Sequence, residues 1–96
     1  MEILLKKFGT TLLTRPAGED AYKVFKPMLS ELKSGEVLLI DFEGVITFSP
    51  SWGDEFVTPL VETYGNRVEL KNTTNPSVTA SLRTLEDTNR ITINIV

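Results

Sequence analysis

Apolar residues recur at helical spacing in three stretches of the chain. The first stretch covers residues 16–33, and Pro27 inside it predicts a kink or a division into two shorter helices. The second lies between Ser49 and Gly65, and the third begins at Asn75, which precedes a proline suited to a first helical turn. The predicted buried faces are Ala21, Val24, Phe25, Met28, Leu29 and Leu32; Trp52, Phe56, Leu60 and Tyr64; and Val78, Leu82 and Leu85.

Strand patterns separate these helices. Residues 36–42 form the clearest strand, and the continuous apolar run Val37–Ile40 predicts a central strand buried on both faces. A short strand is expected at residues 67–71. Residues 91–96 alternate strictly between apolar and polar, which is typical of a strand with one buried face.

The first residues predict a hairpin. Two β-favouring segments, residues 2–8 and 11–13, flank Gly9-Thr10, which suits a turn. The element order is then β-β-α-β-α-β-α-β. Strand–helix–strand units of this length favour parallel strands, so we expect a mixed, mostly parallel sheet with an N-terminal hairpin and with the helices packed mainly on one face. No linker or repeat interrupts the pattern, which indicates one α/β domain over residues 1–96.

Composition and charge argue against several classes of function. The net charge is −3, without the basic surplus of a nucleic-acid-binding protein, and the longest apolar run is far too short to cross a membrane. The chain has neither cysteine nor histidine, so Ser-His and Cys-His catalytic pairs are absent. No glycine cluster suits a phosphate-binding loop. We therefore expect a cytoplasmic, non-catalytic protein that needs no cofactor or metal and binds neither nucleic acid nor membrane; a carboxylate-only metal site or a catalytic role of Asp41 is the alternative.

The segment before the second helix holds the first candidate site. Two registers fit a helix start: Ser49 as the cap before Pro50, or Ser51 as the cap with Asp54 three residues later. Alternatively, Ser49 or Ser51 is a partner contact or a phosphorylation switch, since a helix N-terminus favours anions. Asp54 and Glu55 would repel a phosphate there, so a binding surface is favoured over a switch.

Three further residues are candidates for partner binding. Trp52 belongs to a helical apolar stripe and is most simply a core residue, but a tryptophan at a helix start also suits an interface anchor. Arg15 either is solvated, binds an acidic partner group or pins the following loop through a carboxylate. Asp41, at the carboxyl end of the central strand, is the expected carboxylate, and ligand sites gather at that end of parallel sheets.

The segment EVLLIDFEGVITFSPSWGDEFVTPLVETY, residues 36–64, resembles the STAS-like domain family of unknown function, as does Thr14-Arg15 before the first helix. The resemblance implies distant kinship with STAS domains of the anti-anti-sigma type, found in bacterial partner switching. In those proteins a partner kinase phosphorylates a serine of an Asp-Ser-Ser-Gly motif. Here Ser49 falls at the motif's aspartate, Pro50 at the usual acceptor, Ser51 at the next serine and Trp52 at the glycine.

This resemblance implies a protein-interaction or regulatory domain that binds through the loop and N-terminus of the second helix. It also implies a histidine-kinase-like ATPase or a sigma-related regulator as partner, although the proline at the acceptor position prevents a direct transfer of the switch. Two alternatives stay open. One is a small-ligand or nucleotide sensor. The other is an accessory subunit that forms a homodimer through the apolar edge of residues 91–96.

Overall fold

The computed structural model describes residues 1–96, which form a four-stranded sheet, a separate two-stranded ladder and three α-helices. The sheet has the order β1-β3-β5-β6, and every neighbouring pair is parallel. Its strands are β1 (Glu2–Leu4), β3 (Leu38–Asp41), β5 (Val68–Lys71) and β6 (Asn94–Ile95). The mostly parallel α/β sheet predicted from the sequence is confirmed.

The helices begin at the residues that the sequence indicates. Their bounds are α1 (Arg15–Phe25), α2 (Pro50–Tyr64) and α3 (Pro76–Asn89). Around Pro27, α1 gives way to the 3-10 helix η2 (Lys26–Glu31), as predicted, because proline cannot complete the α-helical hydrogen bonds. Gly65 ends α2 with φ 61, a backbone conformation that favours glycine. Two further 3-10 helices are η1 (Leu5–Phe8) and η3 (Gly65–Arg67).

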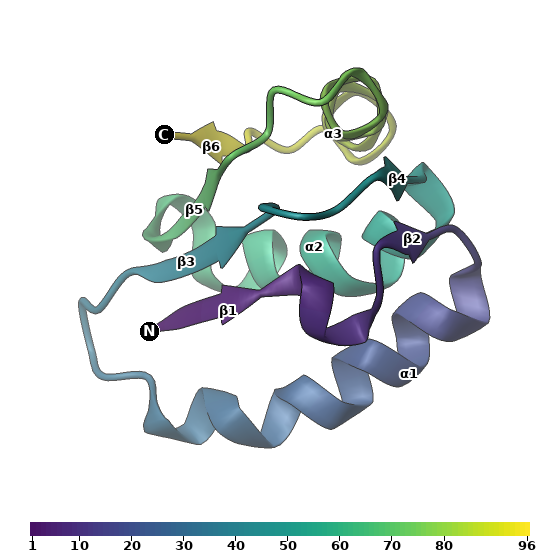
Figure 1. Ribbon diagram of the computed structural model, residues 1–96. Helices are drawn as coiled ribbons and strands as arrows, with labels where there is room; N and C mark the ends of the chain where they lie inside the picture. The colour runs from purple at the N-terminus through teal and green to yellow at the C-terminus, as the bar shows by residue number, and fades with distance from the viewer.

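The predicted N-terminal hairpin is wrong. After β1, η1 turns the chain out of the sheet, so that β2 (Thr11–Leu12) pairs in parallel with β4 (Thr47–Phe48) and not with β1. Gly9 has a positive φ (126, with ψ 169), a backbone conformation that favours glycine, and it ends η1 instead of forming a tight turn between two antiparallel strands. This second ladder lies over the amino end of α2 (Figure 1).

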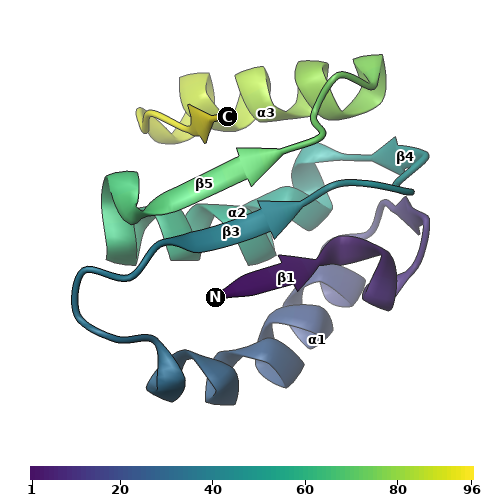
Figure 2. The ribbon, with the colours of Figure 1, turned by 60° about the vertical axis from the view of Figure 1, so that its left-hand side comes forward.

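The helices cover one face of the sheet. Figure 2 shows α1 and α2 behind β1, β3 and β5, with α3 along the side of β5 and β6. In β3, Leu38 and Ile40 point into the core and are fully buried. Val37 and Leu39 are exposed or half-buried, so the expectation of a strand buried on both faces is wrong: no helix layer covers the second face.

The core is built around α2, which packs against both α1 and α3. The rings of Trp52 and Phe56 stack at 5.1 Å, and Phe48 meets Trp52 edge-on at 5.9 Å. Gly18 lets α1 approach this point closely, since a Cβ there would lie 2.5 Å from the backbone oxygen of Trp52. The amino ends of α1 and α2 are thereby held together.

Candidate functional site

The amino end of α2 is capped by Ser49. Its Oγ accepts a hydrogen bond from the amide of Trp52 at 3.2 Å and donates one to the carbonyl of Leu13 at 2.5 Å. Of the two registers left open by the sequence, the structure therefore has Ser49 as the cap and Pro50 as the first helical residue. The hydroxyl of Ser49 also ties α2 to the segment that leads into α1.

Ser51 lies one residue beyond Pro50 and is exposed. It lines a shallow pocket of about 200 Å³ to which all three helices contribute. The pocket residues, which we call the helix corner, are Arg15, Pro50, Ser51, Asp54, Thr84, Leu85 and Thr88. The structure thus separates the two serines: Ser49 holds the helix end, and Ser51 faces solvent at the mouth of a polar depression.

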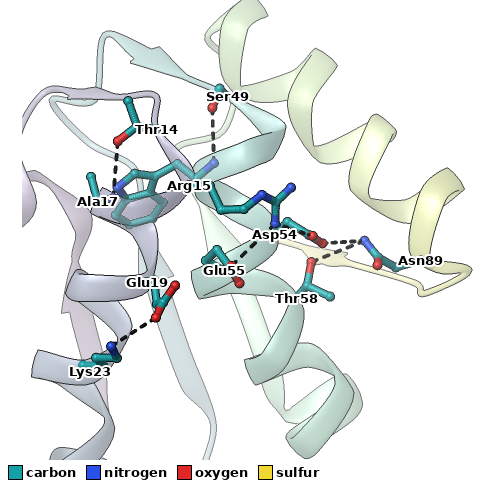
Figure 3. Close-up of polar contacts among 11 residues, drawn as sticks. Thr14, Arg15, Ala17, Glu19, Lys23, Ser49, Asp54, Glu55, Thr58 and Asn89 are labelled. Carbon is teal, nitrogen blue, oxygen red and sulfur yellow. Dashed lines mark hydrogen bonds and ion pairs between the residues drawn. The ribbon is translucent and has the colours of Figure 1, made fainter.

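Arg15 connects α1 to α2 at the helix corner. Its Nη1 lies 3.0 Å from Oδ2 of Asp54 and 3.6 Å from Oε1 of Glu55 (Figure 3). The expectation that a carboxylate pairs with Arg15 is met by Asp54, whereas the choice of Asp41 as that carboxylate is wrong. The sequence could not reveal this pairing, because it depends on how closely α1 and α2 pack.

Asp54 is shared among the three helices. Its second oxygen accepts a hydrogen bond from Nδ2 of Asn89 in α3 at 3.1 Å. Burial alone would raise the pKa of Asp54, but hydrogen bonds from Arg15, Asn89 and Thr58, together with the charge of Arg15, outweigh burial and lower that pKa. The hydrogen bond that Arg15 donates to Asp54, together with the charges of Asp54 and Glu55, raises the pKa of Arg15. Asp54 therefore holds the corner together as an ionised carboxylate.

Asn89 and the threonines of α3 were missed by the sequence analysis. Asn89 donates to Asp54 and to the carbonyl of Leu85, and Thr84 and Thr88 line the pocket beside Ser51. No local signal marks them, because an asparagine at the end of a helix and exposed threonines are ordinary surface features. Only the packing of α3 against α2 brings them to the corner.

Trp52 is a buried residue of the core. It is 1% exposed and lies within an aromatic cluster that includes Phe8, Phe48 and Phe56. The interpretation as a core residue is confirmed, and the interface-anchor hypothesis is wrong. The reason is geometric: Trp52 lies in the first turn of α2, and its ring packs against the rings of Phe8, Phe48 and Phe56.

Asp41 forms a separate polar cluster at the carboxyl end of the sheet. It accepts hydrogen bonds from Nδ2 of Asn72 at 2.8 Å and from the amide of Glu43 at 2.9 Å, and Nζ of Lys71 lies 3.8 Å away. Burial opposes ionisation of Asp41, but these hydrogen bonds and the charges of Lys71 and Lys6 lower its pKa. These contacts join β3 to β5 and the loop after β3, so Asp41 is positioned as a structural residue.

The fold and this helix corner define the class of protein: an α/β domain of the STAS-like type, with one helix-covered sheet face and an accessible amino end of the second helix. The model of the family described as STAS-like domain of unknown function (DUF4325) matches residues 20–78, which is more than half of the chain, so the chain belongs to this family. No curated protein and no solved structure matches the chain. None of its helices is both long and apolar enough to cross a membrane.

Proposed function

We propose that the protein is a non-catalytic interaction domain whose helix corner binds a partner protein. The observation that carries the proposal is the exposed Ser51 at the first turn of α2, beside a polar pocket built from three helices. The carbonyl of Leu13 is bonded to the cap of α2, and the 43% exposed side chain of Leu13 adds an apolar contact next to the corner. Apolar and polar groups side by side are typical of a transient protein interface.

The geometry favours a contact surface over enzymatic chemistry. Each charged group at the corner already has a partner of opposite charge, because Arg15 pairs with Asp54 and Glu55. The carboxylate of Asp54 also accepts a hydrogen bond from Asn89. Groups held in this way position the helices and are not free to transfer a proton. Within this proposal, a histidine-kinase-like ATPase or a sigma-related regulator is the expected partner, by kinship with STAS domains.

Ser51 is the residue through which such an interface would be regulated. The hydroxyl of Ser49 is engaged on both sides, so its phosphorylation would break the helix cap, whereas Ser51 offers an exposed hydroxyl. Arg15 is the cation of the pocket but is paired with two carboxylates, so a phosphate on Ser51 would add unbalanced negative charge and disrupt the contact with the partner.

The test is a pull-down from the native host with the wild-type chain and with Ser51→Arg, which places a long side chain in the pocket without touching the core. We expect the partner retained by the wild type to be lost from this variant at unchanged melting temperature. Ser34→Arg is the matched control: Ser34 lies in an exposed turn outside the helix corner, so this variant should retain the partner. Equal retention by both variants would refute the role of the corner.

A second experiment addresses regulation. The protein is incubated with ATP and native lysate, and modified residues are mapped by mass spectrometry. We expect modification at Ser51 and none at Ser49, because only the former is accessible without disrupting α2. An unmodified Ser51 would leave the corner as a constitutive contact surface and would contradict the switch.

A further inference from the structure

The strand β1 forms an unpaired edge of the sheet. It pairs only with β3, in the register Ile3 with Ile40, and the amide of Leu39 bonds the carbonyl of Met1 at 2.8 Å. Along a parallel strand, successive residues direct their backbone groups to opposite neighbours. The backbone groups of Ile3 therefore face β3, and those of Glu2 and Leu4 face outward. The carbonyl of Leu4 accepts the first bond of η1, so the N–H and C=O of Glu2 and the N–H of Leu4 are the groups that no strand or helix receives.

An apolar groove of about 200 Å³ runs beside this edge. Its walls include Ile3 and Phe8 on one side and Val24 and Met28, from α1 and η2, on the other. Val24 is 70% exposed and Met28 is 50% exposed, so two of the most exposed large apolar side chains of the protein lie together next to open backbone groups. Apolar surface beside an unpaired strand edge is a favourable place for strand addition.

We propose that this groove binds an extended segment of a partner protein, which adds to β1 as a fifth strand of the sheet. The N–H and C=O of Glu2 and the N–H of Leu4 would form the ladder, and every second side chain of the segment would rest on Val24 and Met28. This requires apolar residues at alternate positions. The two charged side chains of the groove are those of Glu2, which pairs with Lys71, and Lys7, which has no ion pair within the chain; an acidic residue of the segment would therefore complement Lys7.

The position of α1 favours an extended peptide segment, and not a second folded copy of the chain, as the occupant of the groove. Figures 1 and 2 both show α1 and η2 extending beyond β1, below the position that a fifth strand would take. A second folded copy that approached edge to edge would bring its own overhanging α1 into the same layer, and two helix axes need about 8–10 Å of separation. An extended segment has no such layer and fits between β1 and the overhang.

The probe is a pair of capped peptides, Glu-Val-Thr-Val-Thr-Val-Thr and its reversed sequence, titrated into the full chain and followed by NMR. We expect one of the two to bind saturably with a Kd below about 1 mM, shifting the amides of Glu2 and Leu4 and the methyl groups of Val24 and Met28. A peptide with serine in place of valine should not bind. Binding by neither valine peptide would overturn the proposal.

Substitutions locate the site. Val24→Lys and Met28→Lys change exposed side chains, so folding should persist, and each should weaken peptide binding by at least about tenfold. Ile46→Lys, at a 64% exposed apolar residue outside the groove, should leave binding unchanged. Lys7→Glu should favour a peptide that carries lysine in place of glutamate. Equal binding by all variants would overturn the proposal.

Two outcomes distinguish this groove from other interfaces. Ser51→Arg should leave peptide binding intact, so this experiment tests the binding role of the groove independently of the binding role of the helix corner. Sedimentation of the free protein tests self-association: a dimer that Val24→Lys dissociates would mean that a second copy occupies the edge, and would refute the bare segment as occupant.

Discussion

At the residue scale, two buried glycines set how closely the helices approach. A Cβ at Gly53 would lie 2.7 Å from the ring of Phe48 and 2.8 Å from a methyl group of Leu85, both ends of side chains. A Cβ at Gly18 would instead clash with the backbone of Trp52, which cannot move away by a change of rotamer. The sequence offers no sign of this difference, because a glycine within a helical pattern looks the same whether it faces solvent or another helix.

Gly18→Ala should destabilise the protein although alanine is the better helix former. Overpacking against a rigid neighbour costs about 1–3 kcal/mol, which offsets or exceeds the propensity gain of about 1 kcal/mol. Urea unfolding measures the change. Gly35→Ala is the comparison, since it meets no atom within 4 Å and tests only the cost of φ +78. A Gly18→Ala protein clearly more stable than the wild type would contradict the close approach of α1 and α2.

The residue scale also shows what the sequence could supply at the candidate site. Ser49 and Asn75 were identifiable as caps because the capping contact is local: each accepts from an amide two or three residues later. Arg15 was identifiable as a candidate cation at the start of α1. Its partner was not, because Asp54 is 39 residues away in the sequence and only helix packing brings the two side chains together. The burial of Trp52 could be predicted from its apolar stripe. The exposure of Ser51 could not, because it depends on how α1 and α3 pack against α2.

At the element scale, the capping of α2 gives a prediction that separates its two serines. Ser49→Ala should lower the free energy of unfolding by about 1–2 kcal/mol, because the amide of Trp52 and the carbonyl of Leu13 both lose a partner. Ser51→Ala, at an exposed position of the same turn, should change it by less than about 0.5 kcal/mol. Denaturant unfolding of the two variants under identical conditions is the measurement; similar losses would mean that the cap is not at Ser49.

Strand pairing was the least predictable property of the elements. The apolar run Val37–Ile40 correctly indicated a central strand, but an unbroken run of four residues does not reveal whether a second layer covers the sheet. The segments around Gly9 were adjacent in sequence and so suggested a hairpin. In the structure, η1 turns the chain out of the sheet after β1. Strand β2 then pairs with β4, whose residues come 36 positions later in the sequence. Helix positions follow from local periodicity, whereas strand partners depend on contacts between distant residues.

At the scale of the whole molecule, two ionised aspartates join elements at opposite places: Asp41 links β3 to β5 and its loop, and Asp54 links the three helices. The pKa of each is lowered in the folded state from a value of 3.8. A lowered folded-state pKa means that the unfolded chain binds protons first as the pH falls. The stabilisation from both groups is therefore fully present well above pH 3.8 and is lost as the pH falls through the lower, folded-state pKa values.

This linkage predicts the acid stability of the protein. Asp41→Asn should be less stable than the wild type at neutral pH, because an amide accepts the bonds of Asn72 and Glu43 less well than a carboxylate and leaves Glu2 as the only acidic partner of Lys71. The difference should shrink as the pH falls below 3.8, towards the lowered pKa at which the wild-type carboxylate of Asp41 is protonated. Urea unfolding at several pH values measures both curves, with Asp87→Asn, at an exposed site, as the charge-matched control. If the Asp41→Asn curve runs parallel to the wild type even below pH 3.8, the carboxylate of Asp41 does not join β3 to β5 in the way described.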